Sequence, residues 1–339
     1  MSAPRGLSGL FAAFLAVSAL ALWVAGTRWE RDVLPLSGLT REQDIMRPAA
    51  STGAVPMNQP MQFVVDAAEW SPWRAVAQGT DYIGTGRADE RVGAATAEAA
   101  LRYVLTEDRR DAARPPEDPL AWLDWVIGRA KTADPGNGWY DFTLACVNLE
   151  AALTKFRSTA EGDNQPPVVR DEAKMRRALE LLESASKSAF VDSRRGERML
   201  IRARLVPGNG MDAVSQRIMV WAGTVLPELP TVRTAMNGRL VPWARAVAKP
   251  EDALRILDQV CTIARMLRHS STFMIEWLVA ARFEGEAWDT IAGLHDAAGD
   301  PAAGMRARRA ADETRSWRQA TDTIGEDDPR LGIVDRLWA

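Results

Sequence analysis

The residue types that most often carry chemistry are scarce in this sequence. Among 339 residues there are two cysteines, Cys146 and Cys261, and two histidines, His269 and His295. Each cysteine lies in an apolar, helix-like run and lacks a CxxC partner, which predicts two buried thiols and no zinc or thioredoxin-type chemistry. A disulfide between them is the alternative if the domain is exported. The histidines form no HExxH and no pair at metal-ligand spacing, so we expect surface or capping roles and no metal site.

The sequence also does not match the common motifs for nucleotide binding and for hydrolysis. Residues 79–87 read GTDYIGTGR, but a Walker loop needs Lys and then Ser or Thr where Arg87 and Ala88 stand. A dinucleotide fingerprint needs a third glycine at Asp89 and a preceding strand. We expect instead a flexible loop that leads into a helix starting near Ala88. No GxSxG elbow occurs either, so the sequence predicts no catalytic residue and no cofactor, and we expect the protein not to be an enzyme.

The charge balance argues against nucleic acid as a partner. The chain has 42 Lys and Arg against 45 Asp and Glu, a net charge of -3, whereas nucleic-acid binding usually needs a basic face. A group of arginines near the C-terminal end is accompanied by acids, which predicts an exposed helix stabilised by opposite charges rather than a binding patch. The group comprises Arg306, Arg308, Arg309 and Arg315 with Asp312 and Glu313.

Tryptophan is the unusual component of the composition, with 13 Trp against 3 Tyr. Trp122 and Trp125 are three residues apart and share one face of a predicted helix, and Trp139 and Tyr140 follow closely. Exposed, these four rings would stack on sugar rings or anchor a partner peptide. Buried, they would form the packing seam between helices. They are the candidate binding residues of the sequence.

The first sixty residues divide into three parts. After a short flank at residues 1–6, residues 7–26 contain no charged side chain, and a run of this length predicts a transmembrane anchor. A cleaved signal peptide is the alternative, because small-residue cleavage motifs end the run. Residues 27–60 contain four prolines with scattered Gly and Ser, which predicts a flexible tether.

The side of the membrane is less directly encoded. Several arginines follow the apolar segment and only Arg5 precedes it, which by the positive-inside rule favours a cytoplasmic domain. However, an N-terminal hydrophobic segment on a large chain is most often an export signal, and long domains translocate largely regardless of flanking charge. We therefore expect an extracytoplasmic domain held to the membrane.

The four candidate binding residues lie in a part of the chain that is predicted to be helical. From residue 61 to residue 325, apolar residues recur at spacings of three and four, and prolines and glycines separate the periodic segments. Asp118 before Pro119 predicts a capped helix start, and Ser71-Pro72 predicts another. No alternating pattern long enough for a sheet occurs. The sequence thus predicts an all-α soluble domain of about ten helices with antiparallel neighbours, followed by a tail at residues 326–339.

One stretch resembles the tetratricopeptide-repeat family. Residues 133–140 read ADPGNGWY, which is similar to the junction between such repeats, where a DP-x-N turn leads into a helix opening with Trp and Tyr. In the family this helix continues with an apolar, a small and an aromatic residue. Phe142, Thr143 and Cys146 stand at those places, and Thr143 and Cys146 depart from the pattern.

The second helix of such a repeat has its own pattern of small and bulky residues. Ala178, Leu182 and Ala185 match it, but they come about twenty residues late, after a polar insertion at residues 158–171. The resemblance is specific over residues 133–185. It implies a tetratricopeptide-like array or a divergent α-solenoid, whose stacked helix pairs generally bind other proteins.

Together these features predict a membrane-anchored helical-repeat protein of a bacterial envelope that serves as a non-catalytic scaffold or protein-interaction module. Its expected partners are the membrane, through residues 7–26, and another protein. The alternative is an envelope protein that binds or cleaves glycan with an aromatic platform, formed by Trp122, Trp125, Trp139 and Tyr140.

Overall fold

The computed structural model of this chain describes residues 59–67, 70–105, 117–158, 164–205, 228–246, 249–271 and 274–326. The chain divides into two compact units, Ile45–Arg315 and a second unit made of Met1–Asp44 with Ser316–Ala339. The predicted anchor at residues 7–26 lies outside the described residues, as do nearly all of the tether and the tail.

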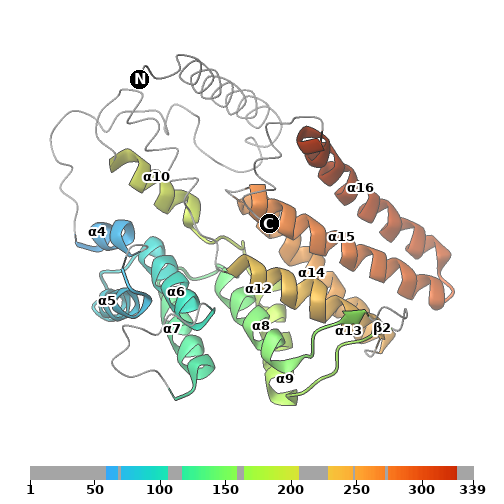
Figure 1. Cartoon of the computed structure of the whole chain (residues 1–339), viewed down its shortest axis with the longest axis horizontal. Coiled ribbons are helices and arrows are strands. Elements are labelled where there is room, and N and C mark those ends of the chain that lie inside the picture. Colours follow the sequence, from blue (N-terminus) through green and yellow to red (C-terminus); the bar gives the residue numbers. More distant parts are fainter. Residues whose placement is uncertain are drawn as a thin grey trace, which may run out of the picture. The chain divides into compact units, whose positions relative to one another are not determined.

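The described part of the chain is almost entirely helical, which confirms the all-α prediction (Figure 1). None of the described helices combines the length and the apolar character needed to cross a membrane. The helices up to residue 205 are α4 (Gln59–Asp66), α5 (Pro72–Gly84), α6 (Glu90–Leu105), α7 (Pro119–Ala133), α8 (Trp139–Ala152), α9 (Glu172–Ser186) and α10 (Arg195–Leu205). Those after it are α12 (Glu228–Ala235), the π-helix η1 (Met236–Leu240), α13 (Val241–Ala246), α14 (Pro250–Ser270), α15 (Met274–Ala297) and α16 (Pro301–Glu326).

Local sequence chemistry sets two of the helix starts as predicted. α7 begins at Pro119, and the Asp118 carboxylate accepts hydrogen bonds from the backbone N–H groups of Leu120 and Ala121 at 2.9 and 3.1 Å. Proline suits this position because the first-turn N–H has no partner within the helix. α5 likewise begins with a proline, Pro72, but the side chain of Ser71 before it makes no capping hydrogen bond.

The loop predicted at residues 79–87 is wrong for its first six residues, because α5 continues to Gly84. Gly79 lies inside this helix, and a Cβ built there would overlap Oγ1 of Thr96 on α6. The glycine is therefore needed for the close approach of two helices rather than for a flexible turn. Packing between helices outweighs the modest helix propensity cost of a glycine.

The core is built from helices that pack against their neighbours in the chain. α5, α6 and α7 pack in sequence order, α8 packs along α9, and α14 packs along α15 (Figure 1). α8 is buried on nearly every side, since α7, α12 and η1 also contact it. The rings of Phe142 on α8 and Phe283 on α15 lie 6.1 Å apart. On α9, the three residues that match the second helix of a repeat are fully buried: Ala178, Leu182 and Ala185.

A small hairpin departs from the purely helical expectation. β1 (Arg157–Ser158) pairs antiparallel with β2 (Asn164–Gln165), within the polar insertion between α8 and α9. The backbone N–H of Phe156 donates to the carbonyl of Gly238 at 2.9 Å, which ties the base of the hairpin to η1. Two residues per strand are too few to show as an alternating pattern in the sequence.

Candidate functional site

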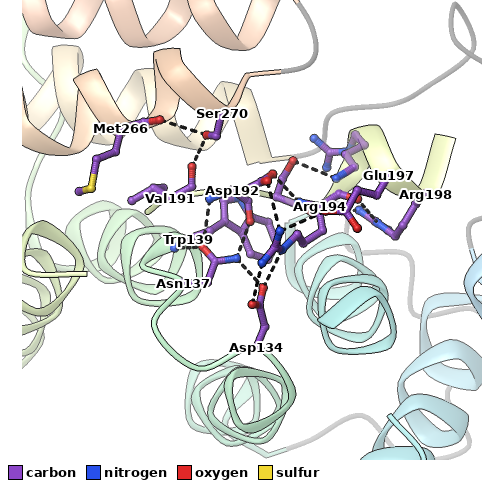
Figure 2. Close-up of polar contacts among 12 residues, drawn as sticks. Asp134, Asn137, Trp139, Val191, Asp192, Arg194, Glu197, Arg198, Met266 and Ser270 are labelled. Atoms are coloured by element: carbon purple, nitrogen blue, oxygen red, sulfur yellow. Dashed lines mark hydrogen bonds and ion pairs between the residues drawn. The ribbon is translucent and has the colours of Figure 1, made fainter. Parts of the chain in front are cut away.

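The turn between α7 and α8, which resembles a repeat junction, is held by the side chain of Asn137. Its amide nitrogen donates to Oδ2 of Asp134 and to the carbonyl of Asp192, both at 2.7 Å. Its amide oxygen accepts from the backbone N–H groups of Trp139 and Asp192, both at 3.0 Å. Figure 2 shows Asn137 placed between Asp134 and the segment that carries Asp192. One buried side chain thus accepts from the first backbone N–H of α8 and fixes a segment fifty-five residues away.

Arg194 also binds Asp134, the residue that accepts a hydrogen bond from Asn137 at this turn. Its Nε and Nη2 donate to the two carboxylate oxygens of Asp134 at 3.1 and 3.0 Å, and Nη1 donates to Glu197 at 3.1 Å. The guanidinium also lies 4.7 Å from the ring centroid of Phe190. The hydrogen bond to Asp134 raises the pKa of Arg194, whereas burial raises the pKa of the Asp192 carboxyl.

The backbone of Arg194 is strained, with a φ of 53°. A non-glycine residue in this left-handed region costs free energy, and it persists only where surrounding contacts enforce it. Here the bidentate pair with Asp134 and the hydrogen bond from the Arg194 N–H to Asp192 Oδ1 at 2.8 Å provide that constraint. The turn at Arg194 directs the next residue into the interior.

That next residue, Arg195, lies at the centre of a buried charge network and is 0% exposed. Its Nη1 and Nη2 donate to the two oxygens of Glu228 at 2.7 and 3.0 Å, and Nη1 also donates to Glu276 at 3.0 Å. A third carboxylate, that of Glu98, lies 3.2 Å from Nη2. The guanidinium on α10 thus joins helices α6, α12 and α15, which are far apart in sequence.

Glu98 is shared by two arginines, since Arg198 on α10 also donates to it. Burial alone would raise the pKa of Glu98, but the charges of Arg195 and Arg198 outweigh burial and lower its pKa to about 2. Burial likewise opposes the charged form of Arg195, and the three carboxylates around it raise its pKa. Glu98 and Arg195 therefore both stay ionised at neutral pH, and neither is suited to exchange protons as a general acid or base.

A small cavity of about 30 Å³ lies beside this network, between α8, α12, α14 and α15. Its lining includes the polar residues Glu228, Glu276 and Ser193 and the rings of Phe142 and Phe283. A volume of this size has room for about two water molecules, which the polar groups would hold. It is too small for a substrate of ordinary size.

The arrangement does not provide the other groups that catalysis commonly uses. Cys146 and Cys261 are free thiols in the core, as predicted, and burial raises the pKa of both. Within the described ranges, no three His, Cys, Asp or Glu side chains come together as a metal site would require. What the network does is fix four helices in one register through charge-assisted hydrogen bonds.

The four candidate aromatic residues do not form one platform. Trp139 and Tyr140 are 2% and 0% exposed and lie in the core, where Trp139 also lines the small cavity. Trp122 is half-buried and stacks on Trp73, with ring centroids 5.8 Å apart. Trp125 points outward and is 52% exposed. The seam between helices accounts for three of the four rings, and a binding role for these residues remains a prediction.

The charge network was not visible as a motif in the sequence. Arg194, Arg195 and Arg198 lie in the segment SRRGERM, which has the composition of a solvated helix start. One signal was available, because Glu98 is the single charge in the run AATAEAAL. A lone carboxylate in a run of small apolar residues predicts a buried ion pair, but it does not name the partner. No family model, curated protein or solved structure matches this chain.

Proposed function

We propose that this protein is a membrane-anchored helical scaffold that binds another protein and carries no catalysis of its own. The proposal rests on two observations: the buried charged groups of the protein are paired with one another, whereas one large aromatic side chain is exposed. The buried charged groups pair helix to helix around Arg195, while the indole of Trp125 on α7 is left half exposed.

The surroundings of Trp125 suit a protein-binding anchor. The Arg129 guanidinium lies 5.5 Å from the Trp125 ring centroid, and Trp and Arg are the residue types enriched at binding hot spots. Gly128 on the same face is exposed and leaves the ring accessible, since no atom lies within 4 Å of a Cβ built there. The helix is linked to α9 by an ion pair between Asp124 and Arg177, at 2.9 Å. A preorganised aromatic anchor loses little entropy on binding.

The tetratricopeptide-like arrangement supports the same proposal. Helices α8 and α9, over which the resemblance extends, pack against each other, and Asn137 fixes the turn that precedes α8. Such pairs are a common framework for protein binding. The membrane anchor and the extracytoplasmic location rest on the uncharged run at residues 7–26.

The glycan-binding alternative has weaker support. A stacking platform needs several ring faces open to solvent. Of the four candidate rings, Trp125 alone is exposed by more than half of its surface. The test below therefore includes a result that would favour glycan binding.

The test is site-specific photocrosslinking in cells with the full-length protein. A photoreactive residue replaces Gly128, which faces open space beside Trp125, and a second variant carries it at Met305, an exposed residue of α16. We expect one protein partner to crosslink at position 128 and not at position 305. This crosslink should be lost when Trp125→Ala is added to the variant with the photoreactive residue at position 128. No partner at position 128, or a partner that survives Trp125→Ala, would overturn the proposal. Retention on envelope glycans that is lost in Trp125→Ala would favour the alternative.

A further inference from the structure

A groove on α15 and α16 lies apart from the charge network. The two helices are joined by a tight turn at residues 298–300, where Gly299 has a φ of 79°. Arg308 on α16 holds the two helices together, donating to both carboxylate oxygens of Asp296 at 2.5 and 3.1 Å. Gly304 fits closely under this pair, because a Cβ there would lie 3.1 Å from Cγ of Asp296.

The groove beside this turn has a volume of about 360 Å³, which falls in the range of small-molecule sites. Five apolar residues line it, here together called its floor: Trp288, Ile291 and three alanines, Ala303, Ala307 and Ala310. Three polar residues also line it, here called its rim: His295, Asp300 and Arg306.

The two charged groups of the rim are not paired with each other. Arg308 and Arg315 on the same helix pair with Asp296 and Asp289, whereas Arg306 makes no ion pair with any described residue. Asp300 uses one carboxylate oxygen, Oδ1, to accept from the N–H of Ala303 at 2.9 Å. No described residue donates a hydrogen bond to its Oδ2. A positive and a negative group thus border the same apolar floor, and both have capacity for a ligand.

The floor is shaped for a flat apolar group. The Trp288 indole N–H donates to Oε1 of Glu284 at 3.4 Å, which restrains the ring. Alanine side chains leave an even surface on which a bulky side chain can lie without displacing them. The volume accommodates a molecule of the size of an amino acid.

We propose that this groove binds a free α-amino acid with a bulky apolar side chain. Its carboxylate lies on the guanidinium of Arg306, its ammonium lies on Oδ2 of Asp300, and its side chain covers the alanines of the floor beside Trp288. A zwitterion matches both charges of the rim, whereas an anion or a cation alone matches one and is repelled by the other. The groove is separate from the face of α7 proposed to bind protein.

The test measures binding of three probes to the full-length protein by isothermal titration calorimetry. The probes are L-phenylalanine, 3-phenylpropionate, which lacks the ammonium, and phenethylamine, which lacks the carboxylate. We expect L-phenylalanine to bind at least about tenfold more tightly than either analogue, since each analogue forfeits one charge-assisted hydrogen bond. Equal binding of all three probes, or binding of none, would refute the proposal.

Variants locate the site. Arg306→Gln should weaken the binding of L-phenylalanine about tenfold and leave the binding of phenethylamine unchanged. Asp300→Asn should also weaken the binding of L-phenylalanine about tenfold, and it should leave the binding of 3-phenylpropionate unchanged. Asparagine still caps the helix start, so α16 is retained. Arg309→Gln, an exposed change on the same helix outside the groove, is the control and should alter nothing. Loss of binding in the control, or full binding in both rim variants, would place the ligand elsewhere.

Discussion

The guanidinium of Arg195 and the carboxylate of Glu228 face each other across two parallel hydrogen bonds of 2.7 and 3.0 Å, with both side chains buried. Glu228 is the first residue of α12, and Arg195 is the first residue of α10. This pair therefore determines where the start of one helix lies against the start of another. A buried pair of this kind gives one geometry at the cost of desolvating two charges.

Removing the central cation should be strongly destabilising. Arg195→Met leaves the carboxylates of Glu98, Glu228 and Glu276 without their shared partner, and we expect a loss of about 3–5 kcal/mol in the free energy of unfolding. Arg195→Lys should recover only part of it, because an ammonium cannot make the two parallel bonds. Urea unfolding followed by circular dichroism measures both. A variant as stable as the parent protein would show that the network is not closed in solution.

Acid should weaken the fold through Glu98. Its pKa in the folded state is about 2, below the ordinary value of 4.5, so folding favours the ionised form. The stability from this group is complete above about pH 5 and is lost as the pH falls toward 2. We expect Glu98→Gln to flatten the dependence of unfolding free energy on pH in that interval. Glu180→Gln, a change at an exposed residue, is the control and should leave the slope intact.

The junction before α8 should depend on the amide of Asn137. Asn137→Ala deletes four hydrogen bonds and leaves the groups of Asp134, Trp139 and Asp192 that formed them without this partner. We therefore expect a loss of about 2–4 kcal/mol in the free energy of unfolding. Hydrogen exchange gives the location, because amide protection at residues 190–194 should fall more than protection within α14. Uniform loss of protection across the helices would contradict a local role.

Two glycines should respond to substitution in opposite ways. Gly79→Ala places a methyl group against Thr96 and should cost about 1–3 kcal/mol of stability. Gly128→Ala meets no atom within 4 Å on an exposed helix face, so it should be neutral or stabilise by up to about 1 kcal/mol. Thermal unfolding of the two variants side by side is sufficient. Equal effects would mean that α5 and α6 lie farther apart than described.

The candidate aromatic residues should separate by their burial. Trp139→Ala removes a core side chain and should cost about 3–5 kcal/mol in the free energy of unfolding. Trp125→Ala removes an exposed one and should change stability by less than about 0.5 kcal/mol. Chemical denaturation compares them directly. A large loss of stability in Trp125→Ala would remove the ring from consideration as a binding anchor.

Much of the fold was predictable because it depends on neighbours in the chain. Helical periodicity follows from contacts three and four residues apart. The helix starts at Pro72 and Pro119 follow from the fixed backbone angle of proline, and at Pro119 also from the capping hydrogen bonds of Asp118. The burial of Ala178, Leu182 and Ala185, which recur at helical spacing, belongs to the same class. The uncharged run at residues 7–26 is a property of the sequence alone.

Only the tertiary structure shows which residues from distant helices contact each other. Gly79 was assigned to a loop from its neighbours, and only the proximity of Thr96 explains its place in a helix. Arg195 meets Glu228 and Glu276 across 33 and 81 residues of sequence. Periodicity gives each helix a buried face but does not say which helix covers it, because the free energy of that choice comes from contacts between distant segments. Burial of Trp139 and exposure of Trp125 follow from the same choice, so their roles were open in the sequence and are distinguished in the fold.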